Sequence, residues 1–264
     1  MVAKATGASY PAVSDRIIFD SLIPLPPLAE QRRIAEVLDR AEALRAQRRA
    51  ALAQLDALTQ SLFLDLFGDP ATNPKGWAKH HLEKLCSIDA PLVDPTREEY
   101  RKLRHYGPDR IERDTGGLLP AKTVEEDGQI SAKFLFDHDA ILYSKIRPNL
   151  NKVALTKGRG LCSADVYPVL VKGDVLTREF FWCLLRGNHF LSYAAEFSNR
   201  ANIPKINRDQ FLGYAAICPP ITLQREFARR VTAVEALKKT QRASLAELDA
   251  LFASLQNRAF RGEL

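Results

Sequence analysis

The two ends of this chain carry the same sequence pattern, repeated at a constant offset of 193 residues. Pro26-Pro27 in the first copy aligns with Pro219-Pro220 in the second, and the alignment continues without a gap to Phe67 and Phe260. A repeat of this length predicts two equivalent structural elements. The non-repeated body between them, about residues 70–215, is where we expect specificity to lie.

Each copy is a long stretch without Gly or Pro, about Leu28 to Phe67 and Ile221 to Phe260. Ala, Leu, Arg, Gln and Glu dominate both stretches, and all five are strong helix formers. Each stretch is therefore predicted to be one helix, spanning roughly 60 Å at the usual rise per residue. The Gly68-Asp69-Pro70 sequence is typical of a helix stop.

Both predicted helices show alternating three- and four-residue spacing, which is typical of a coiled-coil seam. We expect the two helices to form an antiparallel coiled coil with each other; the alternative is that each packs on its own globular domain. Polar residues at matching seam positions, Arg45 and Arg48 against Lys238 and Gln241, are expected to fix register. The predicted apolar interface residues are Leu38, Leu52, Leu55, Leu62, Val231, Leu245, Leu248 and Leu255.

Length and composition indicate a globular chain of one or two domains, with 264 residues and 46% hydrophobic residues. No apolar run reaches the roughly 18 residues that a membrane helix needs, and residues 1–10 do not form a signal-peptide pattern. We therefore expect a cytoplasmic protein without a membrane partner. Four scattered cysteines, Cys86, Cys162, Cys183 and Cys218, predict reduced and mostly buried thiols.

No motif in the sequence predicts an active site, a metal site or a cofactor. Asp137, Asp139 and Lys145 are the nearest arrangement to a nuclease centre, but no Glu-x-Lys accompanies them. Gly158-Arg159-Gly160 lacks the helix that a phosphate-binding loop would precede, and there is no ATP-binding loop. The net charge of +6 suits a polyanionic partner.

Residues 77–215 alternate short apolar runs with turn residues, which predicts an α+β domain with a mainly antiparallel, curved sheet. The expected strands are 134–136, 140–143, 153–155 and 166–171, and the expected short helices are 179–186 and 190–197.

The segment 143–152 is the first candidate for DNA contact. Arg and Asn can each make two hydrogen bonds to base edges, whereas Lys and Ser suit phosphates. The alternative interpretation is a solvated turn between strands. The candidate residues are Tyr143, Ser144, Lys145, Arg147, Asn149, Asn151 and Lys152.

A second candidate lies just before the second repeat, and its alternative interpretation is a polar loop at a domain edge. Its residues are Ser198, Asn199, Arg200, Asn202 and Lys205. A third basic group could contact backbone phosphate. It comprises Lys102, Arg104, His105, Arg110 and Arg113.

Three motifs give the chain a resemblance to a known family: residues 23–31, residues 66–70 and residues 73–77, with sequences IPLPPLAEQ, LFGDP and NPKGW. They resemble the conserved region of specificity subunits of type I restriction-modification enzymes. The second copy matches more loosely, because Leu223-Gln224 replaces the Glu-Gln pair.

The resemblance implies two target-recognition domains that alternate with two helical regions, of which only one recognition domain is complete here. The implied segments are a remnant tail of a first recognition domain (1–22), helical region 1 (23–69), the recognition domain (70–215) and helical region 2 (216–264). The implied partners are double-stranded DNA, methyltransferase subunits and, indirectly, a restriction subunit. Catalysis would reside in those partners.

A single recognition domain per chain leads us to expect a homodimer that recognises a split palindromic site, because two-fold symmetry would supply two domains. Three alternatives stay open. The chain could be an assembly component that pairs with another specificity subunit, a nonfunctional truncated remnant, or a detached recognition module like that of a type IIG enzyme.

Overall fold

The computed structural model describes residues 13–22, 25–197 and 204–264. It divides into two compact units, residues 1–52 with 239–264 (the distal unit) and residues 53–238 (the recognition unit). The two long helices, α2 (Leu28–Phe67) and α8 (Ile221–Arg261), each contribute to both units. The distal unit also holds the short helix α1 (Asp15–Phe19).

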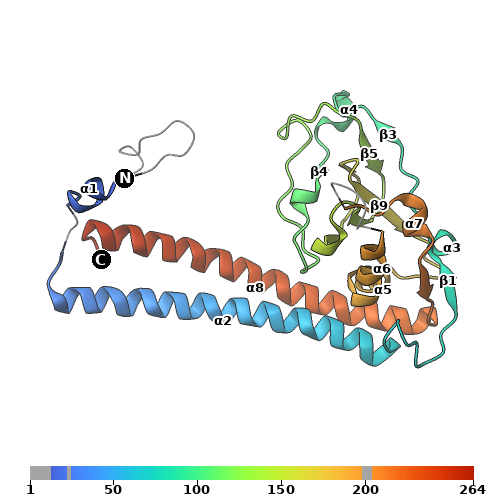
Figure 1. Cartoon of the computed structure of the whole chain (residues 1–264), viewed down its shortest axis with the longest axis horizontal. Coiled ribbons are helices and arrows are strands. Elements are labelled where there is room, and N and C mark those ends of the chain that lie inside the picture. Colours follow the sequence, from blue (N-terminus) through green and yellow to red (C-terminus); the bar gives the residue numbers. More distant parts are fainter. Residues whose placement is uncertain (1–12, 23–24, 198–203) are drawn as a thin grey trace. The chain divides into compact units, whose positions relative to one another are not determined.

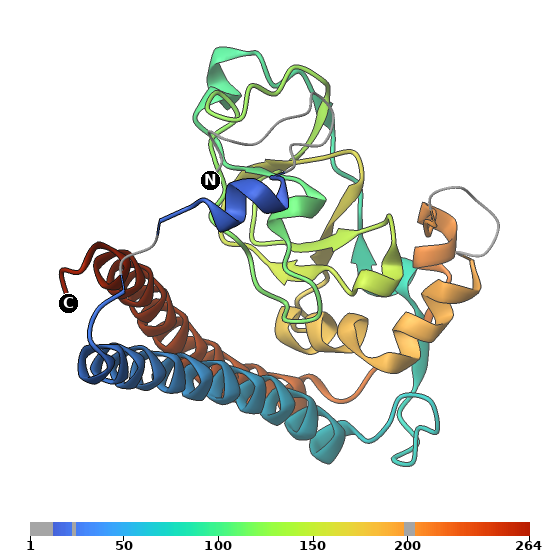
Figure 2. The ribbon, with the colours of Figure 1, turned by 60° about the vertical axis from the view of Figure 1, so that its left-hand side comes forward.

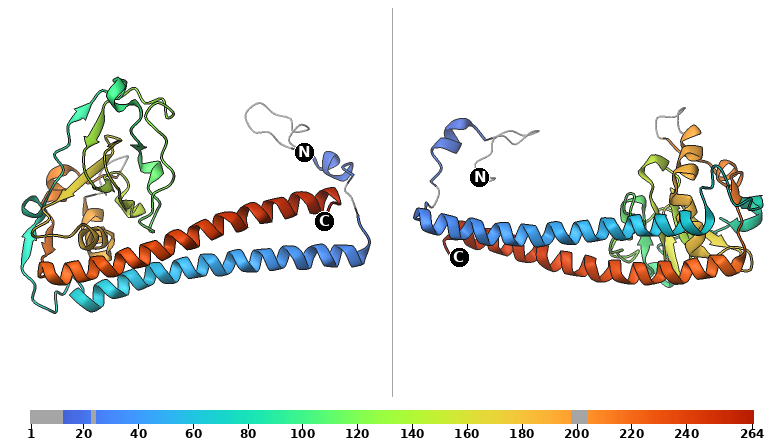
Figure 3. Two further views of the ribbon diagram at one scale, coloured as in Figure 1. Left: turned by 180° about the vertical axis from the view of Figure 1, so that it is seen from behind. Right: turned by 90° about the horizontal axis from the view of Figure 1, so that it is seen from below.

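In each unit, α2 and α8 lie side by side and run antiparallel (Figures 1 and 3). In the distal unit Arg48 contacts Gln241 at 2.9 Å. In the recognition unit the rings of Phe63 and Phe227 lie 5.7 Å apart. All eight predicted interface residues are buried or partly buried, as expected for the contact face. The four polar seam residues, Arg45, Arg48, Lys238 and Gln241, are buried or partly buried as well.

A cap ends α2 and fixes the turn into the recognition unit. Gly68 has a φ of 78°, which favours glycine after a helix end. The Lys75 ammonium donates to the carbonyl oxygens of Asp65 and Leu66, at 2.8 and 2.9 Å. Trp77 Nε1 donates to the Phe67 carbonyl at 2.8 Å. The residues after α2 therefore bind the last carbonyl groups of the helix, which have no partner within it.

Among its described residues, the recognition unit has three small sheets. Strand β1 (Lys79–His81) pairs with β10 (Ala215–Ile217). The second sheet has the order β2 (Cys86–Ser87), β9 (Val166–Val171), β6 (Ile141–Ser144), β7 (Val153–Leu155). The third has the order β3 (Leu92–Val93), β5 (Lys133–Phe136), β8 (Gly160–Cys162), β4 (His105–Tyr106). Every pairing is antiparallel except that of β4 with β8.

Seven short helices lie in the described part of the recognition unit, and Figure 2 shows the orange pair α5 and α6 beside the strands. They are α3 (Leu82–Leu85), α4 (Glu98–Arg101), η2 (Pro108–Arg110), η3 (Pro148–Leu150), α5 (Arg178–Arg186), α6 (Asn188–Glu196) and α7 (Arg208–Leu212). The Thr177 hydroxyl caps α5 by accepting from the Phe180 N–H.

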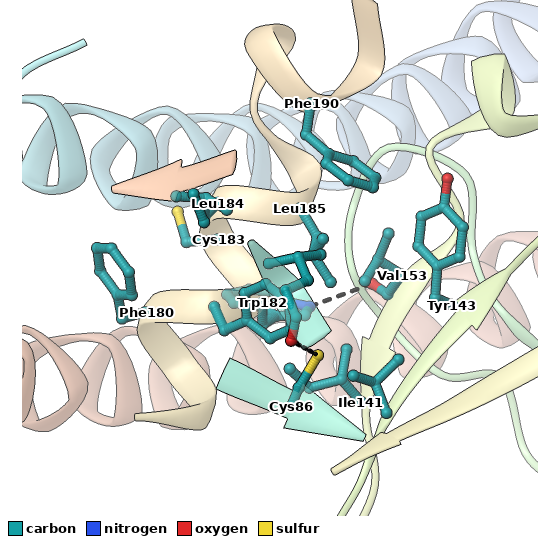
Figure 4. Packing of buried hydrophobic residues seen from close by; sticks show 14 of the residues in the cluster. Cys86, Ile141, Tyr143, Val153, Phe180, Trp182, Cys183, Leu184, Leu185 and Phe190 are labelled. Atoms are coloured by element: carbon teal, nitrogen blue, oxygen red, sulfur yellow. Dashed lines mark hydrogen bonds between the residues drawn. The ribbon is translucent and has the colours of Figure 1, made fainter. Parts of the chain in front are cut away.

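One hydrophobic core cluster joins the first two sheets, α5, α6 and the ends of the long helices within the recognition unit, and two smaller clusters hold the third sheet. Phe67 of α2 packs edge-on against Phe180 of α5, with ring centroids 4.7 Å apart. Trp182 is buried and donates from Nε1 to the Val153 carbonyl at 3.1 Å (Figure 4). The boundaries of the recognition unit therefore lie inside α2 and α8. The segment boundaries predicted from the sequence lie near the ends of these helices.

The predicted fold class is confirmed, with mixed helices and mainly antiparallel sheets beside two long helices. The helix predicted from Leu28 to Phe67 has those bounds, and α8 extends one residue further than expected, to Arg261. Cys86, Cys162 and Cys183 are buried free thiols and Cys218 is partly buried, which confirms that prediction. None of the helices in the described ranges is both long enough and apolar enough to span a membrane.

Candidate nucleic-acid interface

The first candidate DNA-contact segment lies beside Lys205, the described residue of the second candidate. Ile146 and Lys205 form an isolated antiparallel bridge. The Arg147 N–H donates to the Pro204 carbonyl at 2.7 Å, and the Ile206 N–H donates to the Lys145 carbonyl at 3.0 Å. Segments that are about 60 residues apart in the sequence therefore present one continuous polar edge.

Arg147 and Asn149 form the exposed tip of this edge. Arg147 and Asn151 both have a φ of 48°, and they flank the 3-10 helix η3, whose Pro148 is buried. Left-handed backbone at a residue other than Gly costs roughly 1–2 kcal/mol, so surrounding contacts must hold the turn. Because Pro148 is anchored, the side chains of Arg147 and Asn149 project from a fixed turn.

Two lysines on this edge are already engaged. The Lys145 ammonium lies 5.6 Å from the centre of the Tyr167 ring, and Lys152 donates to the Pro108 carbonyl at 2.7 Å. Lys205 is exposed beside Arg147. Lys145 and Lys152 are partly exposed, so the fully accessible donors and cations of the edge are Arg147, Asn149 and Lys205.

Three sequence candidates face inward and cannot reach DNA directly. Tyr143 and Ser144 are 2% and 3% exposed, and Asn151 is 8% exposed. Tyr143 packs against Phe211, while Asn151 Nδ2 donates to the Arg186 carbonyl at 3.2 Å. All four residues of β6 are buried, so this strand is covered on both faces. The sequence pattern did not predict this burial. Four further candidates, Ser198, Asn199, Arg200 and Asn202, lie outside the described residues.

The third basic group is largely neutralised. Arg104 donates to the Ala121 carbonyl at 2.7 Å, while Arg110 and Arg113 pair with neighbouring aspartates. His105 is 5% exposed, and its Nδ1 lies 2.7 Å from Asp127 Oδ2. Burial lowers the pKa of His105, and the hydrogen bond from His105 lowers the pKa of Asp127. Most of this group is therefore paired within the protein, although Lys102, Arg104 and Arg113 are exposed.

No catalytic arrangement emerges from the ionisable residues that the structure describes. No three His, Cys, Asp or Glu side chains among them cluster so as to hold a metal. Burial raises the pKa of the Cys86 and Cys183 thiols to about 12, so neither is poised as a nucleophile. The described edge presents hydrogen-bond donors and positively charged side chains, which suit the binding of a polyanion.

The long helices carry two equivalent ionic triads that the sequence reasoning missed. In the distal unit Arg45 contacts Glu42 on its own helix, and its Nε lies 2.6 Å from Asp249 Oδ1 on α8. The hydrogen bond to Asp249 raises the pKa of Arg45.

In the recognition unit Lys238 Nζ lies 2.6 Å from both Glu235 Oε1 and Asp56 Oδ1. The 193-residue offset relates each member of one triad to a member of the other. This match between the repeats could have predicted the triads from the sequence.

Exposed leucines also recur in repeat-equivalent pairs. Leu44 and Leu251 are 47% and 49% exposed in the distal unit. Leu58 and Leu237 are 44% and 55% exposed in the recognition unit. The offset of 193 maps Leu44 onto Leu237 and Leu58 onto Leu251. Each unit therefore has a pair of exposed leucines, one from each helix, and we call each pair a leucine patch.

A buried glutamine connects α8 to the recognition unit. Gln224 is fully buried, its Oε1 accepts from the Thr177 N–H at 2.9 Å, and its Nε2 donates to the carbonyls of Val175 and Pro219 at 3.0 and 2.8 Å.

Its repeat equivalent in the distal unit, Gln31, makes the corresponding bond to the Pro26 carbonyl at 2.8 Å. Phe260, the equivalent of fully buried Phe67, is 75% exposed. The distal unit thus has residues equivalent to those that hold the recognition domain. In the described part of the chain, no domain packs on them.

Comparisons with known proteins agree with this architecture. No protein-family model matches the chain. The Escherichia coli type I restriction enzyme EcoDI specificity subunit is 29% identical over 299 aligned positions. That alignment covers 98% of this chain and 66% of the relative, so the chain spans slightly less than two thirds of the relative's length.

Solved structures show the same fold. A chain from a study of complex assembly and conformational transition of the type I R-M system matches with a TM-score of 0.54 and 25% identity, covering 98% of this chain and 66% of that one. The type I restriction-modification S subunit from M. genitalium matches with a TM-score of 0.58 and 13% identity, covering 98% of this chain and 68% of that one.

Proposed function

Because this chain is a homologue of type I restriction enzyme specificity subunits, we propose that it is the non-catalytic DNA-recognition subunit of such a complex. Its recognition unit would read one half-site per chain, and its helices would bind methyltransferase subunits and, through them, a restriction subunit. The observation that carries the proposal is the exposed Arg147–Asn149 tip beside Lys205. The cytoplasmic location expected from the sequence stays a prediction.

Within this proposal some residues of the edge contact bases and others contact phosphates. Arg147 and Asn149 can each make paired hydrogen bonds to base edges, of the kind that discriminate by about 1–3 kcal/mol per base pair. Lys205 and Lys145 suit phosphate oxygens, which position the protein without reading sequence. The fixed turn at η3 supports base reading, since a rigid tip keeps its donors aimed in one direction.

The test is selection of preferred duplexes from a random pool, followed by affinity measurements on preferred and scrambled duplexes at several salt concentrations. Arg147→Ala and Asn149→Ala should lower the ratio of preferred to scrambled affinity by roughly 10-fold or more. Lys205→Ala, the matched control, should weaken both duplexes alike and reduce the salt dependence. An unchanged affinity ratio in the first two variants would refute base recognition by this tip.

We propose that each leucine patch binds one methyltransferase subunit. The patches are repeat-equivalent, so a partner that fits Leu44 and Leu251 fits Leu58 and Leu237 as well. Exposed alanines occupy equivalent positions beside them, namely Ala43, Ala50, Ala57, Ala236, Ala243 and Ala250. Small and apolar side chains at heptad spacing are what a partner helix packs against.

Light scattering of the mixture with a methyltransferase subunit tests this stoichiometry. Per copy of this chain, the double variant Leu44→Glu/Leu251→Glu should bind one methyltransferase chain fewer than the wild type, and so should Leu58→Glu/Leu237→Glu. Gln47→Glu/Gln256→Glu adds the same two charges at exposed positions of the same two helices and should leave the stoichiometry unchanged. Full stoichiometry in both double variants would refute docking at the patches.

We further propose that a second copy of the chain supplies the second recognition domain of a homodimer. Supporting this, Gln31 and exposed Phe260 are equivalent to the residues that hold the recognition unit on α2 and α8. Mass determination by light scattering across a wide concentration range is the test. A chain that stays monomeric at high concentration would refute the homodimer, and the second domain would then have to come from another polypeptide.

A further inference from the structure

Two repeat-equivalent residues contact each other directly in the distal unit. In the distal unit Arg48 Nη1 donates to Gln241 Oε1 at 2.9 Å, and these positions are themselves related by the offset of 193. Two equivalent positions of an antiparallel pair can meet only where a local two-fold axis passes between the helices. Arg48 and Gln241 therefore mark the centre of symmetry of the α2–α8 contact.

The two triads are related by the same offset of 193 residues, and so they cannot decide which helix pairs with which. Arg45 of the first repeat reaches Asp249, while Lys238 of the second repeat reaches Asp56. An antiparallel pair of two α2 helices would set Arg45 against Asp56, and a pair of two α8 helices would set Lys238 against Asp249. Every combination of the repeats thus retains two cation–carboxylate contacts.

The central position does distinguish the combinations. A pair of two α2 helices would place Arg48 against Arg48, which is a contact of like charges. A pair of two α8 helices would place Gln241 against Gln241. Only the α2–α8 pair matches a guanidinium donor with an amide acceptor, as observed.

We propose that Arg48 and Gln241 make helix pairing selective, so that α2 accepts an α8 helix and rejects a second α2. The partner that fits α2 is thus an α8-type helix with an uncharged acceptor at its centre, from this chain or from another copy. An exchange that formed one α2–α2 and one α8–α8 pair between two copies would contain the Arg48–Arg48 contact and is disfavoured. This inference does not depend on DNA recognition or on a native homodimer.

Refolding of the full chain at high concentration tests the selectivity. A spin label on Ala50→Cys, an exposed position near the centre of α2, gives a short label-to-label distance only when two α2 helices pair. Since packed helices lie about 8–10 Å apart, that distance would be below about 20 Å. Protein without Ala50→Cys, labelled in the same way, corrects for the native cysteines.

Arg48→Gln should raise the fraction of short distances about fivefold after unfolding in urea and refolding, the order expected for losing one partly exposed like-charge contact. The matched control Arg48→Gln/Gln241→Arg exchanges the two side chains, so the like-charge contact would now occur in an α8–α8 pair. This variant should return the fraction of short distances to the wild-type level. Equal fractions in the wild type, Arg48→Gln and the double variant would overturn the inference.

Thermal unfolding gives an independent measurement if Arg48→Gln folds poorly. Gln241→Arg places two arginines at the centre of the α2–α8 pair and should lower the Tm, while adding Arg48→Gln should restore most of it. A Tm for Gln241→Arg equal to that of the wild type would overturn the inference. The mass of the wild type before unfolding reports separately on the homodimer.

Discussion

The backbone N–H of Thr177 donates to the side-chain oxygen of Gln224 at 2.9 Å, and through this bond a residue of α8 holds the start of α5. Gln224 is fully buried and donates to two further carbonyl oxygens. Since the repeat gives the distal unit an equivalent, Gln31, the chain contains an internal control for this interaction.

Gln224→Ala should lower the free energy of unfolding by about 2–4 kcal/mol, because it leaves one buried N–H and two carbonyl groups without their partner. Gln31→Ala removes the same amide from a partly exposed position and should cost less than about 1 kcal/mol. Urea unfolding of both variants measures the difference. Equal losses would mean that Gln224 does not connect α8 to the recognition unit.

Phe67→Ala and Phe260→Ala form a second matched comparison. Phe67 is fully buried, and its ring packs against Phe63, Phe180 and Phe227. Truncating a buried phenylalanine costs about 3–5 kcal/mol, whereas an exposed one costs little. Thermal and urea unfolding should therefore show a large loss for Phe67→Ala and almost none for Phe260→Ala. If Phe260→Ala destabilised the isolated chain as strongly, its side chain would have to be covered in solution.

The contact face of the two helices is tested by Leu52→Asp and Leu245→Asp. Both leucines are partly buried on that face, so a carboxylate there would lose hydration without a matching cation. We expect each variant to lose about 1–3 kcal/mol of unfolding free energy. Leu44→Asp, at a leucine that is 47% exposed, should lose less than about 0.5 kcal/mol. Full retention of helix content and Tm in the first two variants would refute the assigned face.

Sequence periodicity predicted the long helices well because their pattern is sustained over many turns and ends at Gly and Pro. The bounds of α2 were predicted to the residue, and strands β7 and β9 were too. The short strands β2, β3 and β4, two residues each, were not predicted, since their pairing depends on distant partners.

The candidate site was predictable in composition but not in accessibility. Arg147, Asn149 and Lys205 are exposed as a DNA contact requires, whereas Tyr143 and Ser144 lie in a strand that is covered on both faces. A polar residue such as Ser144 can be buried when its hydroxyl finds a local acceptor, here the Ile146 carbonyl at 3.1 Å. Spacing along the chain carries no information about such a contact.

Stability should depend on pH through His105. Burial lowers the pKa of His105 in the folded protein below its ordinary value of 6.5. The unfolded chain then binds a proton at a higher pH than the folded chain does, so the free energy of unfolding must fall as pH drops below about 6.5. The loss should level off once pH is below the folded pKa. Asp127 contributes in the same direction at lower pH, because the hydrogen bond from His105 holds its pKa below the ordinary value of 3.8.

Urea unfolding of the wild type between pH 7.5 and about pH 5 measures the histidine contribution as a slope of stability against pH. His105→Gln removes the titrating imidazole and should flatten that slope. His80→Gln, at an exposed histidine, should leave the slope unchanged. If wild type and His105→Gln showed the same slope, the buried His105–Asp127 pair would not be the source of the pH dependence.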